Sequence, residues 1–406
     1  MHVGDGQFAS LILLAAVGAA PAVQPRPTGL DVILRTIDTD AASVKLVALS
    51  LRDGAVVRRP EEGEHRIPTE ELVRVTFLTT IEKRTANAAA LRFAGGDRIY
   101  GRMVSAADAG EDVVFFETAD LGMLHVPLEQ VEGIDLSAAA SADFQEALDR
   151  LDRPAGHDED RILLTNGDVL RGFITSLDSD HITLDTAAGR TDVPVGLAVA
   201  VRMAGSMLPA LPRPYFVITL QESGRLLVTD LDWSGDAASA RLPYGQHVGL
   251  EAERLVDLEV IGGRWEWIGD HPPISFEHTA MLALGWTFRI DRNVLGGPLT
   301  IDGERFERGV GVHSRSSLTY DLQGAYREFV ASFGIDDDSG PYADATAIIL
   351  VDGKRRHVQE HVRRGERHGP LRVDVARAKR IELVVDFGDN GDMQDRFDWI
   401  EAALIR

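Results

Sequence analysis

Glycine-marked turns recur in a fixed pattern along the first two thirds of the sequence, and they limit the folds that this part can adopt. Gly96-Asp97 and Gly167-Asp168 are each followed by a further glycine, Gly101 and Gly172, and apolar segments flank both turns. Glycine supplies the positive φ that a tight turn needs, and the Asp side chain can bond nearby backbone. The pattern therefore predicts β-hairpins.

Each of these hairpins begins a run of short β segments that closes after a Val-Pro pair, Val126-Pro127 or Val193-Pro194. A looser copy surrounds Arg52-Asp53-Gly54, and a fourth surrounds Ser223-Gly224. Five short strands in roughly fifty residues, with bent glycine turns, are typical of small SH3-like or Sm-like barrels. We therefore predict small β units at residues 28–80, 88–136, 160–204 and 213–262.

A different period appears between the second and third units. Phe144, Leu148 and Leu151 recur at helical spacing, and Ser141 precedes them as a candidate cap. Pro154 ends the pattern. The segment predicts a short helical linker.

The charge balance argues against some partners. The chain has 42 basic and 64 acidic residues, a net charge of -22, and neutralising a phosphate backbone requires an excess of Lys and Arg. We therefore expect no nucleic-acid partner. There is no cysteine, which excludes disulfides, thiolate zinc sites and cysteine nucleophiles.

The first 22 residues are typical of a signal peptide. Phe8 to Pro21 form an apolar core, and Ala20-Pro21-Ala22 is a small-residue cleavage site, although His2 and Asp5 stand where Lys or Arg is usual. The prediction is export to the periplasm or the extracellular space; the alternative is an uncleaved start on a cytosolic chain. No other apolar run approaches the ~18 residues that span a bilayer, so we expect no membrane span in the mature chain.

The last third of the chain combines strand-length apolar segments with two polar loops. Gly309-Val310-Gly311-Val312-His313-Ser314 lies at one side of an Asp run, Asp336 to Asp338, and the acidic segment Asp386 to Trp399 closes the region. We interpret this arrangement as a β-sandwich whose sheets bring the polar loops near one another.

Residues 264–406 resemble an NPCBM domain, the carbohydrate-binding module with a galactose-binding-like jelly-roll fold that is often attached to glycoside hydrolases. The matching pieces, in order, are Asp291-Arg292-Asn293, Gly296-Gly297-Pro298-Leu299, Gly309 to Ser314, Tyr320-Asp321-Leu322, Phe333 to Asp337, and Asp386 through Asp398-Trp399. The resemblance implies binding without chemistry. The expected fold is all-β: tandem small β-barrel units, a short helical linker and a C-terminal jelly-roll β-sandwich.

Sugar recognition needs planar surfaces for the apolar ring faces and fixed hydrogen-bond partners for the hydroxyls. The candidates in expected loops of the sandwich are Trp286, His313, Asp336, Asp337, Tyr342, Asn390 and Asp392. His313 either lies at a loop mouth or bonds a neighbouring group and fixes the loop. Trp399, Trp265 and Trp267 are expected to be packing residues.

The acidic C-terminal loop is a candidate calcium site. Hard cations take carboxylate and carbonyl oxygens, and the predicted ligands are Asp386, Asp389, Asp392 and Asp395. The resemblance favours a structural Ca2+, because related modules often carry one. The alternative is a solvated turn in which Asp side chains cap backbone amides.

Enzymatic activity is not expected. The chain has no Gly-x-Ser-x-Gly elbow, P-loop or His-Glu-x-x-His motif and no eight-fold alternation of strands and helices. The predicted function is attachment to a glycan or polysaccharide. The alternatives are a cell-envelope scaffold, in which the sandwich binds protein instead of sugar, and an accessory part of a glycoside hydrolase system. A separate candidate partner is a protein bound through the N-terminal barrels.

Overall fold

Strands dominate the computed structural model of the chain, and the expected all-β class is confirmed. It describes residues 29–39, 41–59, 63–79, 88–105, 112–136, 141–152, 159–222, 224–234, 237–281 and 285–406. Within these ranges the one α-helix is α1 (Gln145–Leu151), and no helix is long and apolar enough to cross a membrane. The predicted signal peptide, residues 1–22, lies outside the described residues.

The N-terminal part contains four groups of strands with the same order of pairing. The first group comprises β1 (Leu30–Thr36), β2 (Ala42–Ser50), β3 (Gly54–Arg59), β4 (Gly63–Ile67) and β5 (Leu72–Phe77). The second comprises β6 (Ala89–Phe93), β7 (Arg98–Met103), β8 (Val113–Thr118), β9 (Gly122–Pro127) and β10 (Val131–Asp135).

The third group comprises β11 (Asp160–Leu164), β12 (Val169–Leu177), β13 (His181–Thr186), β14 (Gly189–Pro194) and β15 (Ala198–Arg202). The fourth has its second strand interrupted, and comprises β16 (Tyr215–Leu220), β17 (Gly224–Val228), β18 (Asp230–Ser234), β19 (Ala237–Arg241), β20 (His247–Glu251) and β21 (Leu255–Ile261). In every group the first strand pairs with both the second and the last, as β1 does with β2 and β5.

The predicted SH3-like or Sm-like units are not closed barrels, and the reason lies in the last strand of each group. In the described residues β4 pairs with β3 and not with β5, and β9, β14 and β20 likewise pair with the strand before them and not with the last strand of their group. Instead, β5 pairs with β21 and β10 pairs with β15, each antiparallel. A strand can pair along only two edges. The last strand of each group pairs with its own first strand on one edge and with the last strand of another group on the other, so no edge is left to close a barrel.

The four groups also share one hydrophobic core. Buried side chains from all of them, including Leu46, Phe116, Ile182 and Phe216, form a single contiguous cluster. A unit of this size buries little apolar surface alone, so sharing a core stabilises the array. We call residues 29–262 the β array.

The repeated turns explain the glycine and proline pattern. A Cβ on Gly101 would lie 2.1 Å from the Glu117 carbonyl oxygen, and one on Gly172 would lie 2.3 Å from that of Asp185, so only glycine permits these close strand crossings. Pro127 and Pro194 each precede a short 3-10 turn before the last strand, where their fixed φ suits the entry.

The predicted helix is present but starts later than Ser141. A 3-10 turn, Ala142–Phe144, comes first, and α1 then runs from Gln145. Leu151, with Phe144 and Leu148 partly buried beside it, packs against Leu163 and Val199 of the third group. The segment is therefore a covering helix on the third group as well as a linker.

Residues 265–405 form the predicted β-sandwich. One sheet has the order β24 (Arg289–Ile290), β27 (Gly309–His313), β34 (Arg396–Ile405), β29 (Glu328–Ile335), β32 (Arg367–Asp374), with β22 (Trp265–Trp267) also on β34. The other has the order β23 (Ser275–His278), β28 (Ser316–Asp321), β33 (Arg380–Phe387), β30 (Asp344–Val351), β31 (Lys354–Arg363). A small hairpin, β25 (Leu299–Ile301) and β26 (Glu304–Phe306), completes it.

Aromatic side chains fill the space between the two sheets. Trp399, Phe333 and Phe397 are fully buried and contact one another. Trp399 is thus a core residue, as predicted.

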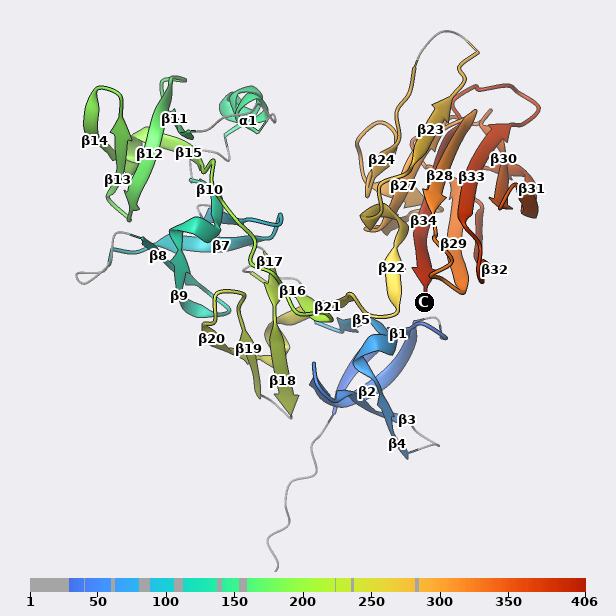
Figure 1. Cartoon of the computed structure of the whole chain (residues 1–406), viewed down its shortest axis with the longest axis horizontal. Helices are drawn as coiled ribbons and strands as arrows, with labels where there is room; N and C mark the ends of the chain where they lie inside the picture. Colours follow the sequence, from blue (N-terminus) through green and yellow to red (C-terminus); the bar gives the residue numbers. More distant parts are fainter. Residues whose placement is uncertain are drawn as a thin grey trace, which may run out of the picture.

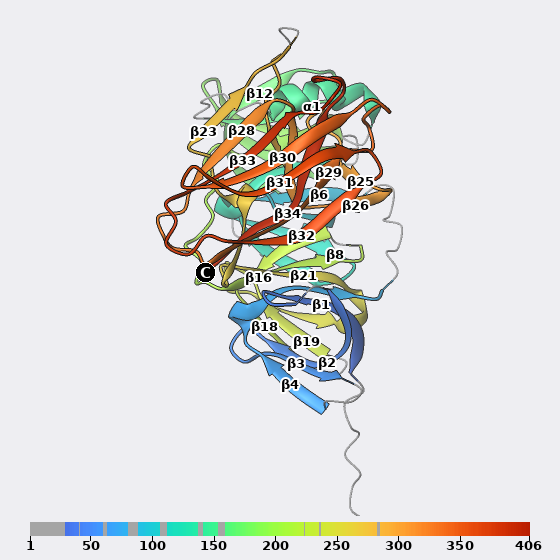
Figure 2. The same ribbon diagram turned by 90° about the vertical axis from the view of Figure 1, so that its right-hand side faces the viewer.

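The sandwich rests on the β array by one end. Trp265, Trp267, Val330 and Ile405 of the sandwich form a cluster with Ile37 and Val73 of the first group. Figure 1 shows the C-terminus at this end, next to β1 and β22, with the third group and α1 well away from the sandwich. Figure 2 shows the sandwich face-on above β1 and β2.

Candidate functional site

Strand direction gathers the polar loops at the free end of the sandwich. β34 runs toward the array and ends beside β22, so the residues before it lie at the opposite end. Antiparallel pairing then places the end of β27, the end of β33 and the start of β30 at that same free end. We define the loop end as residues 278–281, 285–288, 313–316, 336–344 and 387–396.

Two of the predicted sugar-binding residues are stacked at the loop end. The rings of Trp286 and His313 lie 5.0 Å apart, with only 5° between their planes. The backbone N–H of Trp286 donates to Nδ1 of His278 at 3.4 Å, and the His278 ring meets the His313 ring edge-on. Trp286 is half-buried, so its orientation is fixed while part of its surface stays accessible.

His313 is buried and uncharged at neutral pH. Burial lowers its pKa, an effect that the nearby Ser314 carbonyl and Asp392 oppose. The His313 Nδ1 lies 2.9 Å from the Ser314 carbonyl oxygen. Since a carbonyl can only accept, Nδ1 carries the proton and Nε2 is a hydrogen-bond acceptor.

Asp392, Asn390 and Tyr342 also lie at the loop end, and none of them is buried. Asp392 accepts the backbone N–H of Met281 at 2.9 Å, and the Asn390 amide donates to the Tyr342 carbonyl at 3.0 Å. Tyr342 is 62% exposed and Met281 and Met393 are similarly open. The loop end therefore presents apolar surface beside hydrogen-bonding groups.

Asp336 and Asp337, also predicted to contact sugar, make internal contacts. Asp336 is fully buried and accepts hydrogen bonds from Asn293 Nδ2, from the Thr300 N–H and from the Asp338 N–H. Asp337 accepts the N–H groups of Asp302 and Gly303 and so caps the β25–β26 turn. Both carboxylates fasten this hairpin to the sheet.

Asp398 lies next to Asp336 inside the sandwich. It is fully buried, and its carboxyl oxygens lack partners at normal hydrogen-bond geometry. Burial, followed by the Asp336 carboxyl, raises the pKa of Asp398 well above its usual range. A protonated Asp398 can share its proton with Asp336, which removes the repulsion between the two groups.

The four aspartates predicted to bind calcium have separate partners. Asp386 accepts the Phe387 N–H and faces Arg315, while Asp392 holds Met281. Asp395 is buried, accepts the Ser314 hydroxyl and the Asp344 N–H, and has its pKa raised to about 6, chiefly by burial. The structure does not bring the four carboxylates together, and calcium binding stays a prediction.

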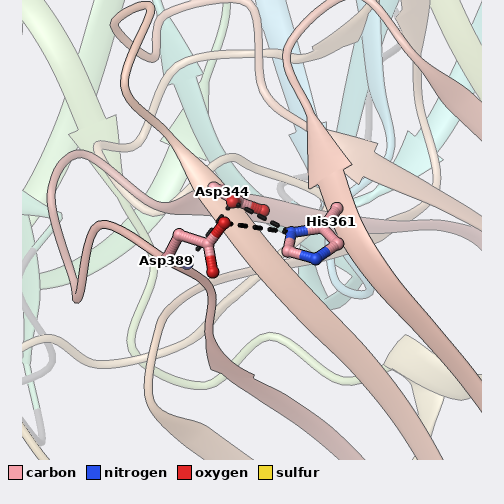
Figure 3. Close-up of side chains that lie close together, drawn as sticks. All are labelled: Asp344, His361 and Asp389. Atoms are coloured by element: carbon pink, nitrogen blue, oxygen red, sulfur yellow. Dashed lines mark hydrogen bonds and ion pairs between the residues drawn. The ribbon is translucent and has the colours of Figure 1, made fainter.

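Asp389 instead joins two residues that the sequence analysis did not single out. Its carboxylate, that of Asp344 and Nδ1 of His361 each offer one ligand atom, and these atoms lie within 4.8 Å of one another. Figure 3 shows the three side chains converging from β30, β31 and the loop after β33. We call them the Asp-His-Asp cluster.

Sequence patterns give little signal for the residues that were missed. Asp344 begins an apolar strand and His361 lies in a run of alternating basic residues, so neither stands out locally. His278 meets His313 because β23 pairs with β28, the strand that follows His313. Long-range pairing creates these contacts.

Comparisons with known proteins agree with the sandwich fold and extend it to a family. The family model described as "NPCBM/NEW2 domain" matches residues 265–405. A protein of Renibacterium salmoninarum named as an endo-alpha-N-acetylgalactosaminidase is 26% identical over 110 residues, which are 27% of this chain and 7% of the relative. The match thus spans a small fraction of that protein.

Solved structures of carbohydrate-binding modules are also similar. A CBM51 module from Clostridium perfringens, in complex with methyl-galactose, is 20% identical, with a TM-score of 0.32, 34% of this chain covered and 99% of that chain. Tandem CBM51 modules of a family 98 glycoside hydrolase from Streptococcus pneumoniae are 13% identical, with a TM-score of 0.32 and coverage of 92% and 88%. The family-model match identifies residues 265–405 of this chain as an NPCBM domain.

Proposed function

We propose that this protein attaches to a glycan through the loop end of its NPCBM domain and that it catalyses no reaction there. The observation that carries the proposal is the Trp286 ring, held flat against His313 at the loop end. An aromatic ring fixed in this way offers a planar surface for the apolar face of a sugar ring.

Polar groups beside the stack can bind sugar hydroxyls. His313 is itself buried and holds the stack in place, whereas the carboxylate of Asp392 and the amide of Asn390 lie together on the loop after β33. Asp392 and Asn390 are not buried, so part of their hydrogen-bonding capacity is open to a ligand. Together, one stacking surface and a few convergent polar groups meet the requirements of a sugar site.

The burial of three carboxyl groups in the sandwich supports the proposal that it catalyses no reaction. A glycosidase places an acid and a nucleophile or base on either side of the scissile bond. Asp336 and Asp398 are instead fully buried against one another, and Asp395 is buried and bonded to Ser314. These carboxyl groups cannot reach a substrate without opening the sandwich.

The β array supports and positions the module in this proposal. It contacts the end of the sandwich opposite the loop end, so a glycan can approach without obstruction from the array. The predicted export fits a glycan-binding role. Service as an accessory part of a glycoside hydrolase system fits the same geometry.

A glycan array probed with the full chain tests the proposal. Trp286→Ala is expected to weaken binding by about tenfold or more, because the stacking surface is lost. Phe173→Ala is the matched control, since Phe173 is an exposed aromatic residue of the third group, far from the sandwich. Failure of the wild-type chain to bind any glycan at about 1 mM, or equal losses in both variants, would contradict the proposal.

A further inference from the structure

The Asp344 carboxylate is nearly enclosed yet only partly satisfied. Its side chain is 3% exposed. Oδ2 accepts from His361 Nδ1 at 3.2 Å and from the Asp389 N–H at 3.3 Å, whereas Oδ1 has no hydrogen-bond partner among the described residues. A buried carboxylate oxygen without a donor is costly unless a cation or a proton balances it.

An irregularity in β31 turns His361 toward this carboxylate. Ala345 lies opposite Val362, but Ala347 lies opposite Gln359, so two residues of β31, Glu360 and His361, face a single residue of β30. Such a bulge changes the direction of a side chain within a strand. The His361 Nδ1 atom comes to lie 3.2 Å from an Asp344 oxygen and 3.8 Å from an Asp389 oxygen.

These separations are close to those of atoms that share one metal ion. With metal–ligand bonds of about 2.1 Å and tetrahedral angles, ligand atoms lie about 3.4 Å apart. The Asp389 side chain is exposed, and its rotation would move its carboxylate oxygen closer to the ligand atoms of Asp344 and His361. Figure 3 shows the three ligand atoms pointing toward a common space.

The ligand types select the ion. Calcium and magnesium prefer all-oxygen sites, whereas an imidazole combined with two carboxylates suits zinc and neighbouring divalent transition metals. We propose that Asp344, His361 and Asp389 bind one divalent transition-metal ion of the zinc class. Three protein ligands leave a position for water on the exposed side, where His361 and Asp389 meet solvent.

The ion would join β31 to two segments of the loop end. Asp344 begins β30, His361 lies in β31, and Asp389 belongs to the loop that also carries Asn390 and Asp392. The Asp344 N–H already donates to Asp395, which accepts the Ser314 hydroxyl. A bound ion would therefore fix the loop after β33 against the sheet.

Arg363 is a competing cation at the edge of the cluster. Its Nη2 lies 3.9 Å from Asp344 Oδ2, and its side chain is more than half exposed. Because its charge repels a metal ion, Arg363→Gln is expected to leave affinity unchanged or raise it.

Calorimetric titration of the untagged, chelator-treated full chain with ZnCl2 tests the proposal. The expected result is one ion per chain, with affinity reduced about tenfold or more in His361→Gln and in Asp389→Asn. Both side chains are exposed, so the variants should fold, which far-UV circular dichroism checks. His181→Gln, an exposed histidine on β13, is the matched control and should bind zinc as the wild type does.

Other outcomes of this titration overturn the proposal. These are no zinc binding below about 1 mM, equal zinc affinity in His361→Gln and the wild type, or tighter binding of CaCl2 than of ZnCl2 that is insensitive to His361→Gln. None of these readouts uses a glycan, so the metal site and the glycan site are tested separately.

Discussion

At the scale of single residues, Asp97 illustrates how a turn residue acquires a long-range partner. The sequence places it in a Gly-Asp hairpin turn, where an Asp is expected to bond local backbone. In the structure its Oδ2 accepts the N–H of Leu227, from the fourth group, at 2.8 Å. Burial raises its pKa to about 6, although Arg225 and the Leu227 N–H oppose the shift.

This raised pKa predicts a pH-dependent effect of Asp97→Asn. The folded state holds the Asp97 proton more tightly than the unfolded state, so this residue's contribution to stability is greatest below about pH 4 and falls as pH rises to about 6. Asn keeps an acceptor for Leu227 and carries no charge. Relative to the wild type, the variant should therefore be more stable at pH 7.5 than at pH 4. The difference between the two free energies of unfolding, variant minus wild type, should be about 2 kcal/mol larger at pH 7.5.

Chemical denaturation at the two pH values measures this difference. Asp168→Asn is the matched control, because Asp168 occupies the corresponding turn of the third group but is exposed. The same pH-dependent gap in both variants would show that Asp97 has no special role.

Composition and local pattern predict the burial and contacts of a residue well only where its neighbours in sequence determine them. Trp399 in an apolar strand was predicted as core, and it is. Asp336 looked like a loop carboxylate available to ligand, but the turn of β25 and β26 folds over it. No local signal distinguishes an aspartate that caps a remote hairpin from one that faces solvent.

At the scale of elements, the Gly-Val-Gly-Val-His strand shows why small residues recur in the sandwich. A Cβ on Gly311 would lie 2.4 Å from the Arg292 carbonyl oxygen and 2.6 Å from the Asn293 Cα. The strand β27 thus packs directly against the backbone that carries Asn293, the residue that bonds Asp336.

Gly311→Ala is therefore expected to destabilise the sandwich by about 3 kcal/mol, because the backbone of Arg292 and Asn293 cannot yield easily. Gly249→Ala in β20 is the matched control, since nothing lies within 4 Å of its added Cβ. Urea denaturation of the two variants measures the effect, and an equal midpoint for both would refute this account of the motif.

The repeated elements of the β array were largely predictable, whereas their closure was not. Turn glycines and Val-Pro pairs mark the ends of strands, and these are local features. Whether the last strand completes its own barrel or pairs with a neighbour depends on a competing partner, β21 for β5 and β15 for β10. Nothing within one repeat identifies that partner.

At the scale of the whole molecule, a buried ion cluster fastens the sandwich to the β array. Glu259 of β21 is 3% exposed. It accepts two hydrogen bonds from Arg308 of the sandwich, at 2.8 and 3.0 Å, and one from Nε1 of Trp267. Removing one partner of a buried pair leaves an uncompensated charge.

Arg308→Ala is expected to lower the free energy of unfolding by about 2 kcal/mol, less than for an isolated buried pair because Arg74 and Arg225 remain near Glu259. Arg367→Ala is the matched control, since it removes an ion pair with the exposed Glu304 within the sandwich. Thermal unfolding compares the two variants. A similar drop in the free energy of unfolding in both would argue against a special role for the contact between the sandwich and the β array.

The loop end of the NPCBM domain lies away from the contact with the β array. Differences in the exposure of the tryptophans allow binding at the loop end to be measured by fluorescence. Trp233, Trp265, Trp267 and Trp399 are at most 5% exposed, whereas Trp286 is half-buried at the loop end. An aqueous quencher such as acrylamide should therefore reach mainly Trp286.

Acrylamide quenching of the full chain, with and without a saturating glycan selected on the array, tests the central claim most directly. If the sugar ring stacks on Trp286, the glycan should protect the quenchable emission, and Trp286→Phe should keep binding but lose that protected fraction. Unchanged quenching of the wild type while the glycan is bound would place the binding site elsewhere and contradict the account.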